Sequence, residues 1–168
     1  INGTDLNDDG VSADTLEDTS TDATSILNAN WSLGEDVMYG NDGDDTYYVN
    51  STGDLVNEQA SEGSDTVVSR LASYTLRDNV ENLTLDGGSN LTGPYDAPFA
   101  FVPSAFSGTG NGLDNVITGN TNANTLTGLG GHDLLKGMIG NDTLDGGSGN
   151  DTLDGGVGAD SMTGGSGN

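Results

Sequence analysis

The 168-residue sequence contains no cysteine and a single histidine, His132. The absence of cysteine excludes disulfide bonds and thiolate metal sites, and one histidine cannot build a histidine-rich zinc site. Basic residues are almost missing as well: Arg70, Arg77 and Lys136 stand against 27 acidic residues, for a formal net charge of −24. Nucleic-acid binding needs clustered lysine and arginine, so the charge excludes nucleic acid as a partner and disfavours an anionic membrane surface.

Large apolar residues are scarce too. Hydrophobic residues make up 32% of the chain, whereas 28 residues are glycine. No run of about 18 apolar residues exists, so we expect no membrane insertion by this segment. Strong net charge with few apolar residues lies close to disorder, and each glycine adds to the entropy cost of folding. A hydrophobic core alone is therefore marginal, and a divalent cation is the simplest agent that would neutralise the carboxylates.

What the sequence has instead is a nine-residue repeat that begins at Gly110. The first position is always glycine: Gly110, Gly119, Gly128, Gly137, Gly146, Gly155 and Gly164. The eighth is always a large aliphatic residue: Ile117, Leu126, Leu135, Leu144, Leu153 and Met162. The sixth is Asn115, Asn124, Asp133, Asp142, Asp151 or Asp160. A flexible glycine-rich linker has no reason to space aliphatic residues in this way, so the register predicts a folded repeat.

The repeat has a direct physical interpretation. Glycine permits the positive φ angles of a tight turn, and a segment such as 143–145 has room only for a very short strand. One aliphatic side chain per repeat then stacks on those above and below, which builds a thin core that no single repeat could bury. The sixth-position carboxylates gather in the turns, where they repel one another unless a cation lies between them. The sequence therefore predicts an all-β, parallel solenoid with calcium ions bound in its turns.

The segments GGSGNDTLD (146–154) and GGVGADSMT (155–163) resemble the nonapeptide GGxGxDxUx of the RTX (repeats-in-toxin) family. The resemblance implies a right-handed parallel β-roll, in which calcium is held between stacked turns by sixth-position aspartates and by turn carbonyls. It pairs Asp133 with Asp151 and Asp142 with Asp160. The metal ligands that it implies are Gly128, Gly130, Asp133, Gly137, Ile139, Asp142, Gly146, Ser148, Asp151, Gly155, Val157 and Asp160.

The first two repeats of this array depart from the pattern. Their sixth positions are Asn115 and Asn124, and their fourth positions are Leu113 and Asn122 instead of glycine. Because an amide brings no charge, we expect these turns to bind calcium weakly or not at all, with the amides satisfying backbone groups of the turn.

Two further repeats occupy 31–39 and 40–48, and their sixth positions, Asp36 and Asp45, are candidate calcium ligands. Trp31 replaces the first glycine, so this turn is imperfect or starts the roll. The residues that follow alternate β-branched or aromatic with polar side chains, which predicts strands continuing one solenoid from about residue 31 to the end. The expected strands are Thr46–Val49, Asp54–Asn57, Thr66–Arg70, Ser73–Leu76 and Asn82–Leu85.

Two weaker cation sites are possible from the sequence. Asp54, Glu58 and Asp65 would frame one, although they can equally be solvated turn carboxylates. In the acidic segment 1–30, Asp5, Asn7 and Asp9 match the opening of an EF-hand loop, but the twelfth position is Leu16 instead of glutamate. A calcium turn without helices and a plain acidic linker both remain open for this segment, which we interpret as a lead-in or the edge of a preceding domain.

An aromatic insertion at about 93–107 is foreign to the repeat. It holds all three prolines and the aromatic residues Tyr95, Phe99, Phe101 and Phe106. Proline cannot join a central ladder, so we expect this segment to loop out of the solenoid formed by 31–107. It either folds back over apolar surface of the roll or forms a protein contact with another domain, subunit or ligand.

No catalytic site is expected. His132 lies at the variable fifth position of a turn, and the repeat already explains the paired carboxylates. The resemblance implies a segment of a larger, extracellular protein, secreted or on the cell surface, that folds on calcium binding and serves as a structural or export module. Alternatives are a structural or adhesive segment of an RTX adhesin or surface-layer protein, and an accessory domain of a secreted RTX enzyme or toxin. The expected partners are calcium and flanking domains of the same polypeptide, because the repeat region 108–168 stops within a repeat.

Overall fold

The computed structural model describes residues 15–17, 26–28, 35–87 and 105–167. Every regular element in these ranges is a short β-strand, and every strand pairing is parallel. Within the same ranges, no helix has the length and apolar character needed to cross a membrane.

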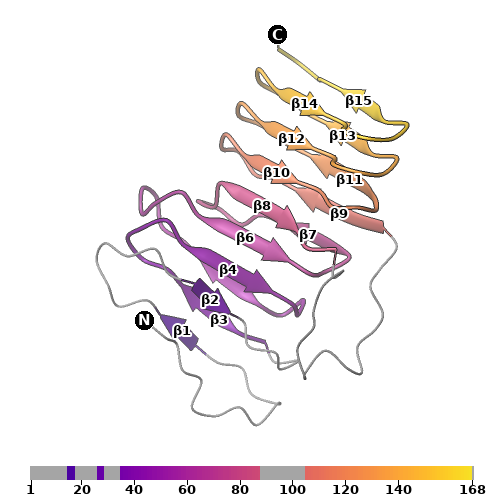
Figure 1. The fold of residues 1–168 in the computed structure, drawn as a ribbon. Helices are drawn as coiled ribbons and strands as arrows, with labels where there is room; N and C mark the ends of the chain where they lie inside the picture. Colours follow the sequence, from indigo (N-terminus) through magenta and orange to yellow (C-terminus); the bar gives the residue numbers. More distant parts are fainter. Residues whose placement is uncertain (1–14, 18–25, 29–34, 88–104, 168) are drawn as a thin grey trace, which may run out of the picture.

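A seven-stranded sheet extends along the described chain (Figure 1). In spatial order it contains β2 (Ile26–Asn28), β4 (Thr46–Val49), β6 (Thr66–Ser69), β8 (Asn82–Leu85), β10 (Val116–Thr118), β12 (Leu134–Lys136) and β14 (Thr152–Asp154). Because neighbours in the sheet are never neighbours in the sequence, each step along it is one full coil of the chain.

The intervening strands form two shorter sheets. One contains β1 (Thr15–Glu17), β3 (Val37–Tyr39) and β5 (Leu55–Asn57). The other contains β7 (Ser73–Thr75), β9 (Ala105–Thr109), β11 (Ala123–Thr127), β13 (Thr143–Asp145) and β15 (Ser161–Thr163). The chain alternates between the long sheet and one of these two, which makes the fold a parallel β-solenoid of the β-roll type, as the sequence predicts.

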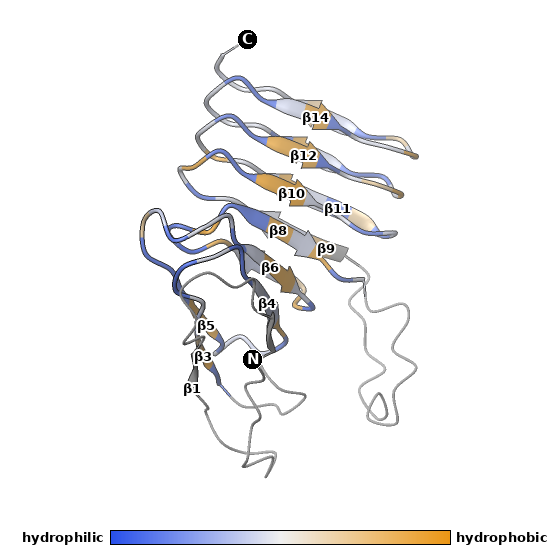
Figure 2. Ribbon diagram, turned by 60° about the vertical axis from the view of Figure 1, so that its left-hand side comes forward, coloured by the Kyte–Doolittle hydropathy of each residue, from blue (hydrophilic) through white to orange (hydrophobic). Residues whose placement is uncertain are grey.

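The eighth-position residues of the array stack in register. Ile117 pairs with Leu135, and Leu126 pairs with Leu144, one coil apart. All four are buried, whereas Met162 in the last strand is 52% exposed. The strand centres of β10 and β12 are hydrophobic and the turns beside them are mostly hydrophilic (Figure 2). Burying one such aliphatic side chain contributes about 1.5–3 kcal/mol, so this core has only one modest contribution per strand.

The section from β4 to β8 has a wider core. Here alternate residues of each strand point inward, as Tyr47 and Val49 do in β4 and Leu83 and Leu85 do in β8. The predicted strands Thr46–Val49 and Asn82–Leu85 are confirmed, and the other three expected strands are each shorter by one residue at one end. Alternation is a dependable signal here because each strand has a buried and a solvent-facing side.

The solenoid begins earlier than the sequence indicated. Strands β1 and β2 lie within 1–30, the segment interpreted as a lead-in, and they pair with β3 and β4. Leu16 aligns with Met38 and Leu27 with Tyr47, so both strands continue the aliphatic position of the repeat. Before β1 the sequence does contain the repeat signal, Gly10 at the second and Asp14 at the sixth position, which sequence reasoning missed. Before β2 the sixth position is Ser25 and glycine is absent, so that strand has no repeat signal.

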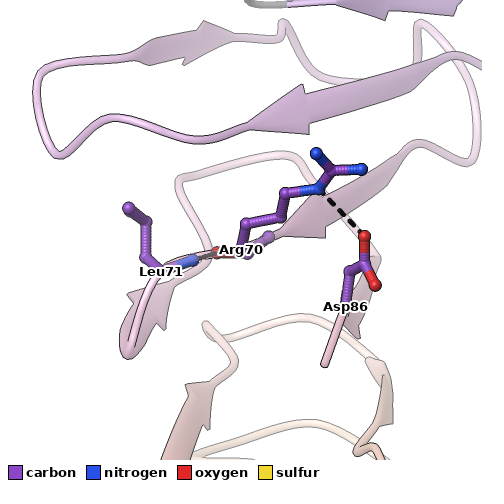
Figure 3. A network of polar contacts seen from close by, with 4 residues as sticks. Arg70, Leu71 and Asp86 are labelled. Atoms are coloured by element: carbon purple, nitrogen blue, oxygen red, sulfur yellow. Dashed lines mark hydrogen bonds and ion pairs between the residues drawn. The ribbon is translucent and has the colours of Figure 1, made fainter. Parts of the chain in front are cut away.

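Two strand ends of the long sheet are joined by an ion pair (Figure 3). Arg70, after β6, donates from Nε to Oδ2 of Asp86, after β8, over 3.0 Å. The adjacent Leu71 packs against the core and its backbone N–H donates to Ser69 Oγ. Ion pairs near the surface contribute up to about 1 kcal/mol. This contact therefore adds little to the stability of the fold and mainly holds the ends of β6 and β8 together.

The aromatic insertion ends in a strand. Phe106, predicted to lie in the insertion, is part of β9 and is 1% exposed within the core. Tyr95, Phe99, Phe101 and the three prolines lie outside the described residues. The alternatives for 93–104 therefore stay open, while Phe106 belongs to the roll.

Candidate calcium sites

The sixth-position residues form two columns that run along the solenoid. In one, the Asn115 backbone N–H donates to Oδ1 of Asp133 over 2.8 Å, and that of Asp133 donates to Oδ1 of Asp151 over 2.9 Å. In the other, Asn124 donates to Asp142 over 2.7 Å and Asp142 to Asp160 over 3.0 Å. The structure thus brings together the pairs that the resemblance implied, since each residue meets its counterpart one coil later.

The second carboxylate oxygen has no such contact. Oδ2 of Asp133, Asp142 and Asp151 is buried and has no hydrogen-bond partner in the described part of the chain. Burial raises the pKa of Asp133, and the negative charges of Asp151 and Asp114 raise it further. A buried carboxylate without a counterion costs several kcal/mol. These oxygens are therefore oriented and desolvated but not neutralised, which is the state that a hard cation would relieve.

The first-position glycines show what faces these oxygens. A Cβ atom on Gly128 would collide with Oδ2 of Asp133 and would lie 2.5 Å from the carbonyl oxygen of Gly146. On Gly137 it would collide in the same way with Oδ2 of Asp142 and the carbonyl of Gly155. Glycine is required here because a carboxylate and a carbonyl of the next coil converge on the space that a side chain would fill.

The third-position residues have another role in the backbone. Gly130 forms a parallel β-bridge with Ser148, and Ile139 with Val157. The carbonyl of Ser148 accepts from Gly131 N–H over 3.1 Å, and that of Val157 accepts from Gly140 N–H over 2.9 Å. A carbonyl oxygen has two lone pairs, so each retains one for a cation. In this structure the third-position backbone groups pair one coil with the next.

The asparagine turns use their amides internally, as predicted. Oδ1 of Asn115 accepts from Asn111 N–H, and Oδ1 of Asn124 accepts from Asn120 N–H, both over 2.8 Å. Nδ2 of Asn115 also donates to the Glu81 carbonyl over 3.2 Å. In these turns the amide of the sixth-position asparagine hydrogen-bonds to the turn backbone. The later turns have a carboxylate at the same position.

The early repeats make the same kind of contact between coils. The Asp36 backbone N–H donates to Oδ1 of Asp54 over 3.2 Å. Oδ2 of Asp54 accepts from Asn50 N–H and Ser51 N–H over 3.0 and 2.9 Å, so both oxygens of Asp54 are engaged. Asp54 thus pairs with Asp36 and does not join Glu58 and Asp65 as the sequence suggested. The candidates Asp5, Asn7 and Asp9 lie outside the described residues.

Asp45 takes the place that was expected for Asp54. Ligand oxygens of Asp45, Glu58 and Asp65 all lie within 4.8 Å of one another, and the Asp45 backbone N–H donates to Oδ1 of Asp65 over 2.9 Å. Sequence reasoning also missed Glu81, whose Oε2 accepts from Asp65 N–H over 2.9 Å and extends the column. The available signal was the position of Glu81 directly before the strand β8, where other repeats have Asp.

This cluster is strongly perturbed. Burial raises the pKa of Glu58 from 4.5 to about 8, and the charges of Asp65, Glu62 and Asp45 add to the effect. Burial likewise raises the pKa of Asp65 to about 6, although the hydrogen bond from the Asp45 backbone opposes the shift and Glu81, Asp45 and Asp44 strengthen it. Without a cation, the folded chain therefore favours protons on these two groups.

Comparison with known proteins agrees with this geometry. The family model of the RTX calcium-binding nonapeptide repeat, described as four copies, matches residues 32–56, 109–144 and 136–168. Endo-1,3-1,4-beta-glycanase ExsH of Rhizobium meliloti (strain 1021) is 41% identical over 81 residues, which cover 48% of this chain and 14% of the glycanase. The similarity thus involves a small part of that protein. No solved structure matches the chain.

Proposed function

This chain belongs to the family of RTX calcium-binding nonapeptide repeats, and from that premise we propose that it is a calcium-triggered folding module of a larger secreted or cell-surface protein. The observation that carries the proposal is the set of buried Oδ2 atoms without partners on Asp133, Asp142 and Asp151. Each lies in a column of carboxylates that repel one another in the absence of cations. Calcium supplies the missing partner and removes the repulsion at the same positions.

The energies favour folding only where calcium is abundant. Extracellular calcium modules have dissociation constants of roughly 0.1–1 mM. At a tenfold excess of ion over this constant, each site adds about 1.4 kcal/mol of stability. Several such sites are comparable with the small stability that the thin core supplies, so calcium decides whether the array folds. Such a chain would be exported unfolded and would fold outside the cell.

Circular dichroism tests this coupling. In calcium the spectrum should be rich in β-structure, and excess EGTA should convert most of the array to disordered chain. The change should reverse when calcium is restored. A β-rich spectrum that survives EGTA unchanged would overturn the proposal.

Matched variants connect the effect to the sites. Asp142→Asn or Asp151→Asn removes an oriented carboxylate and should raise the calcium concentration at the folding midpoint. Asn115→Ala, in a turn closed by amides, removes no calcium ligand and should raise the midpoint less, only by the stability that the lost amide contacts supplied. Equal midpoint shifts in all three variants would contradict the assignment of ligands.

A second candidate follows from the glycanase. The similarity to part of that enzyme favours a role as accessory domain of an extracellular enzyme, with catalysis in another part of the longer polypeptide. A structural or adhesive segment would instead be flanked by tandem extracellular domains. The full open reading frame distinguishes these contexts, because a hydrolase domain next to this segment supports the first and a row of similar non-catalytic domains supports the second.

A further inference from the structure

Glu58 occupies a position where the regular repeats have glycine. It follows strand β5 directly, as Gly137 follows β12 and Gly146 follows β13. At those glycines a Cβ would collide with the sixth-position carboxylate, so a side chain has no room. The turn from Glu58 to Asp65 is longer than the turn from Gly128 to Asp133. The stacked aspartates Asp45 and Asp65 are 20 residues apart in the sequence, whereas stacked aspartates of the array are 18 residues apart. The longer turn gives the glutamate the space that the regular repeat lacks.

The Glu58 side chain lies beside the Glu62 carboxylate, which cannot donate a hydrogen bond while it is ionised. Both carboxylate oxygens of Glu58 and Oδ2 of Asp65 are buried and have no hydrogen-bond partner among the described residues. Asp65 is only 1% exposed. The next coil holds the glutamate backbone, because Asn79 Nδ2 donates to the Glu58 carbonyl over 3.0 Å. Three oxygens are thus fixed in one place and left unsatisfied, which is costly unless a ligand joins them.

We propose that Asp45, Glu58 and Asp65 form a calcium-class cation site of a second kind, in which a glutamate carboxylate replaces the first-position glycine of the repeat. The oxygens of the three groups lie within 4.8 Å of one another, a spacing that one ion can bridge. Calcium affinity rises with the number of charged ligands, so this site should bind more tightly than the array sites. The inference rests on the proposed function only for the choice of ion.

The electrostatics agree with this construction. Burial raises the pKa of Glu58 to about 8 in the cation-free chain, and the nearby charges of Asp65, Glu62 and Asp45 add to the shift. A divalent cation reverses the local field and stabilises the ionised form.

A tyrosine makes the site distinguishable from the calcium sites of the array. A Cβ on Gly40 would collide with both the Tyr47 hydroxyl and the Asp45 carboxylate, so the phenol lies beside this cluster. The region 110–168 contains no aromatic residue. Terbium(III), a hard cation that replaces calcium at oxygen sites, emits when a nearby tyrosine transfers its excitation, and the transfer falls steeply with distance. Strand β12 lies four strands from β4 in the sheet, about 19 Å away.

Terbium titration of the whole chain is the first test. Glu58→Gln should weaken tyrosine-sensitised binding by at least about tenfold, because altering even an outer partner of a metal site costs roughly 10–100-fold. Glu35→Gln, an exposed change of equal charge, should leave the titration unchanged, and Tyr47→Phe should remove most of the emission. Emission that is the same in Glu58→Gln and in the parent would overturn the proposal.

Native mass spectrometry with calcium covers the case of a variant that folds poorly. Glu58→Gln should retain one calcium ion fewer than the parent, and Asp151→Asn should lose ions from the array while keeping the tyrosine-sensitised terbium signal. If no variant or parent retains calcium, the proposed function fails. If Asp151→Asn loses ions but Glu58→Gln retains the full number, the proposed function stands and the inference about Glu58 is wrong.

Discussion

Leu129 and Met138 occupy the second position of their repeats with backbone φ angles of 79° and 78°. Gly147 and Gly156 occupy the same position with φ angles of 93° and 82°. The left-handed region costs an L-residue about 1–2 kcal/mol, a cost that glycine does not have. The two bulky residues are therefore locally strained, and stacking of the coils keeps them in this conformation.

Met138→Gly should stabilise the calcium-bound chain by about 0.5–1 kcal/mol. Relief of the left-handed strain exceeds the extra entropy of glycine in the unfolded chain, which is roughly 0.5–1 kcal/mol. The methionine side chain is exposed, so little burial is lost. Urea unfolding in saturating calcium measures the change. Ile139→Gly, an exposed neighbour without a positive φ, is the control and should destabilise; a loss of stability in both variants would refute the strain.

The pKa of Glu58 predicts how the calcium-free chain responds to pH. The folded value of about 8 exceeds the ordinary 4.5, so the folded state binds the proton more tightly than the unfolded state. The resulting stability is fully present below pH 4.5 and is lost as the pH rises through 8. In protein depleted of calcium on a chelating resin, the melting temperature should therefore fall between pH 5 and pH 8. Glu58→Gln should flatten this slope, and an equal slope in the variant would contradict the prediction.

At the scale of the elements, β9 shows how the irregular section is joined to the array. Its register places Phe106 opposite Asn124 and Gly108 opposite both Tyr74 and Leu126. A Cβ on Gly108 would lie 3.1–3.4 Å from Leu83, Ile117 and Leu126, so the small residue leaves room for aliphatic side chains there. Phe106 fills the core in the same strand, one coil before the first strand of the array in this sheet.

Phe106→Ala should cost about 3–5 kcal/mol, the usual loss for a fully buried ring. The ring is buried in the core cluster. Thermal melting in saturating calcium measures the loss. The double variant Phe99→Ala and Phe101→Ala, run beside it, distinguishes the alternatives for the insertion: a comparable loss supports a cover over the roll, whereas unchanged stability supports a contact surface.

The strands could be predicted from the sequence where a short local period marks the buried position of each strand. The eighth-position leucines and the alternation in 46–85 each follow from a local period, so the sequence alone locates β4, β8 and the array. Strand β2 lacks the glycine and the sixth-position aspartate that mark a coil, whereas Asp14 before β1 was a signal that sequence reasoning did not use. The grouping of Asp45 with Glu58 and Asp65 depends on which turns stack, and coil lengths of 16, 18 and 20 residues in this section make that a three-dimensional property.

For the whole molecule, a solenoid places each coil in contact with its neighbours alone, so stability is the sum of local terms and can vary along the chain. The coils around β4, β6 and β8 bury two residues per strand, among them Tyr47 with Val49 and Leu83 with Leu85. The array buries at most one apolar residue per strand, with none fully buried in β14 or β15, and adds the unpartnered carboxylates of its turns. The two parts should therefore depend on calcium to different degrees.

Hydrogen exchange should reveal this gradient. When calcium is removed, backbone amides in 128–167 should lose protection first, because repulsion there is opposed by at most about 1.5–3 kcal/mol of burial per strand. Amides in 35–87 should keep part of their protection, since their larger core compensates for the loss of the ion near Glu58. Exchange followed by mass spectrometry, with and without calcium, measures both regions in one sample. Glu58→Gln should leave the order of loss unchanged, because the array sites are untouched. Simultaneous loss along the whole chain would show that the solenoid unfolds as one cooperative unit and that the wider core confers no independent stability.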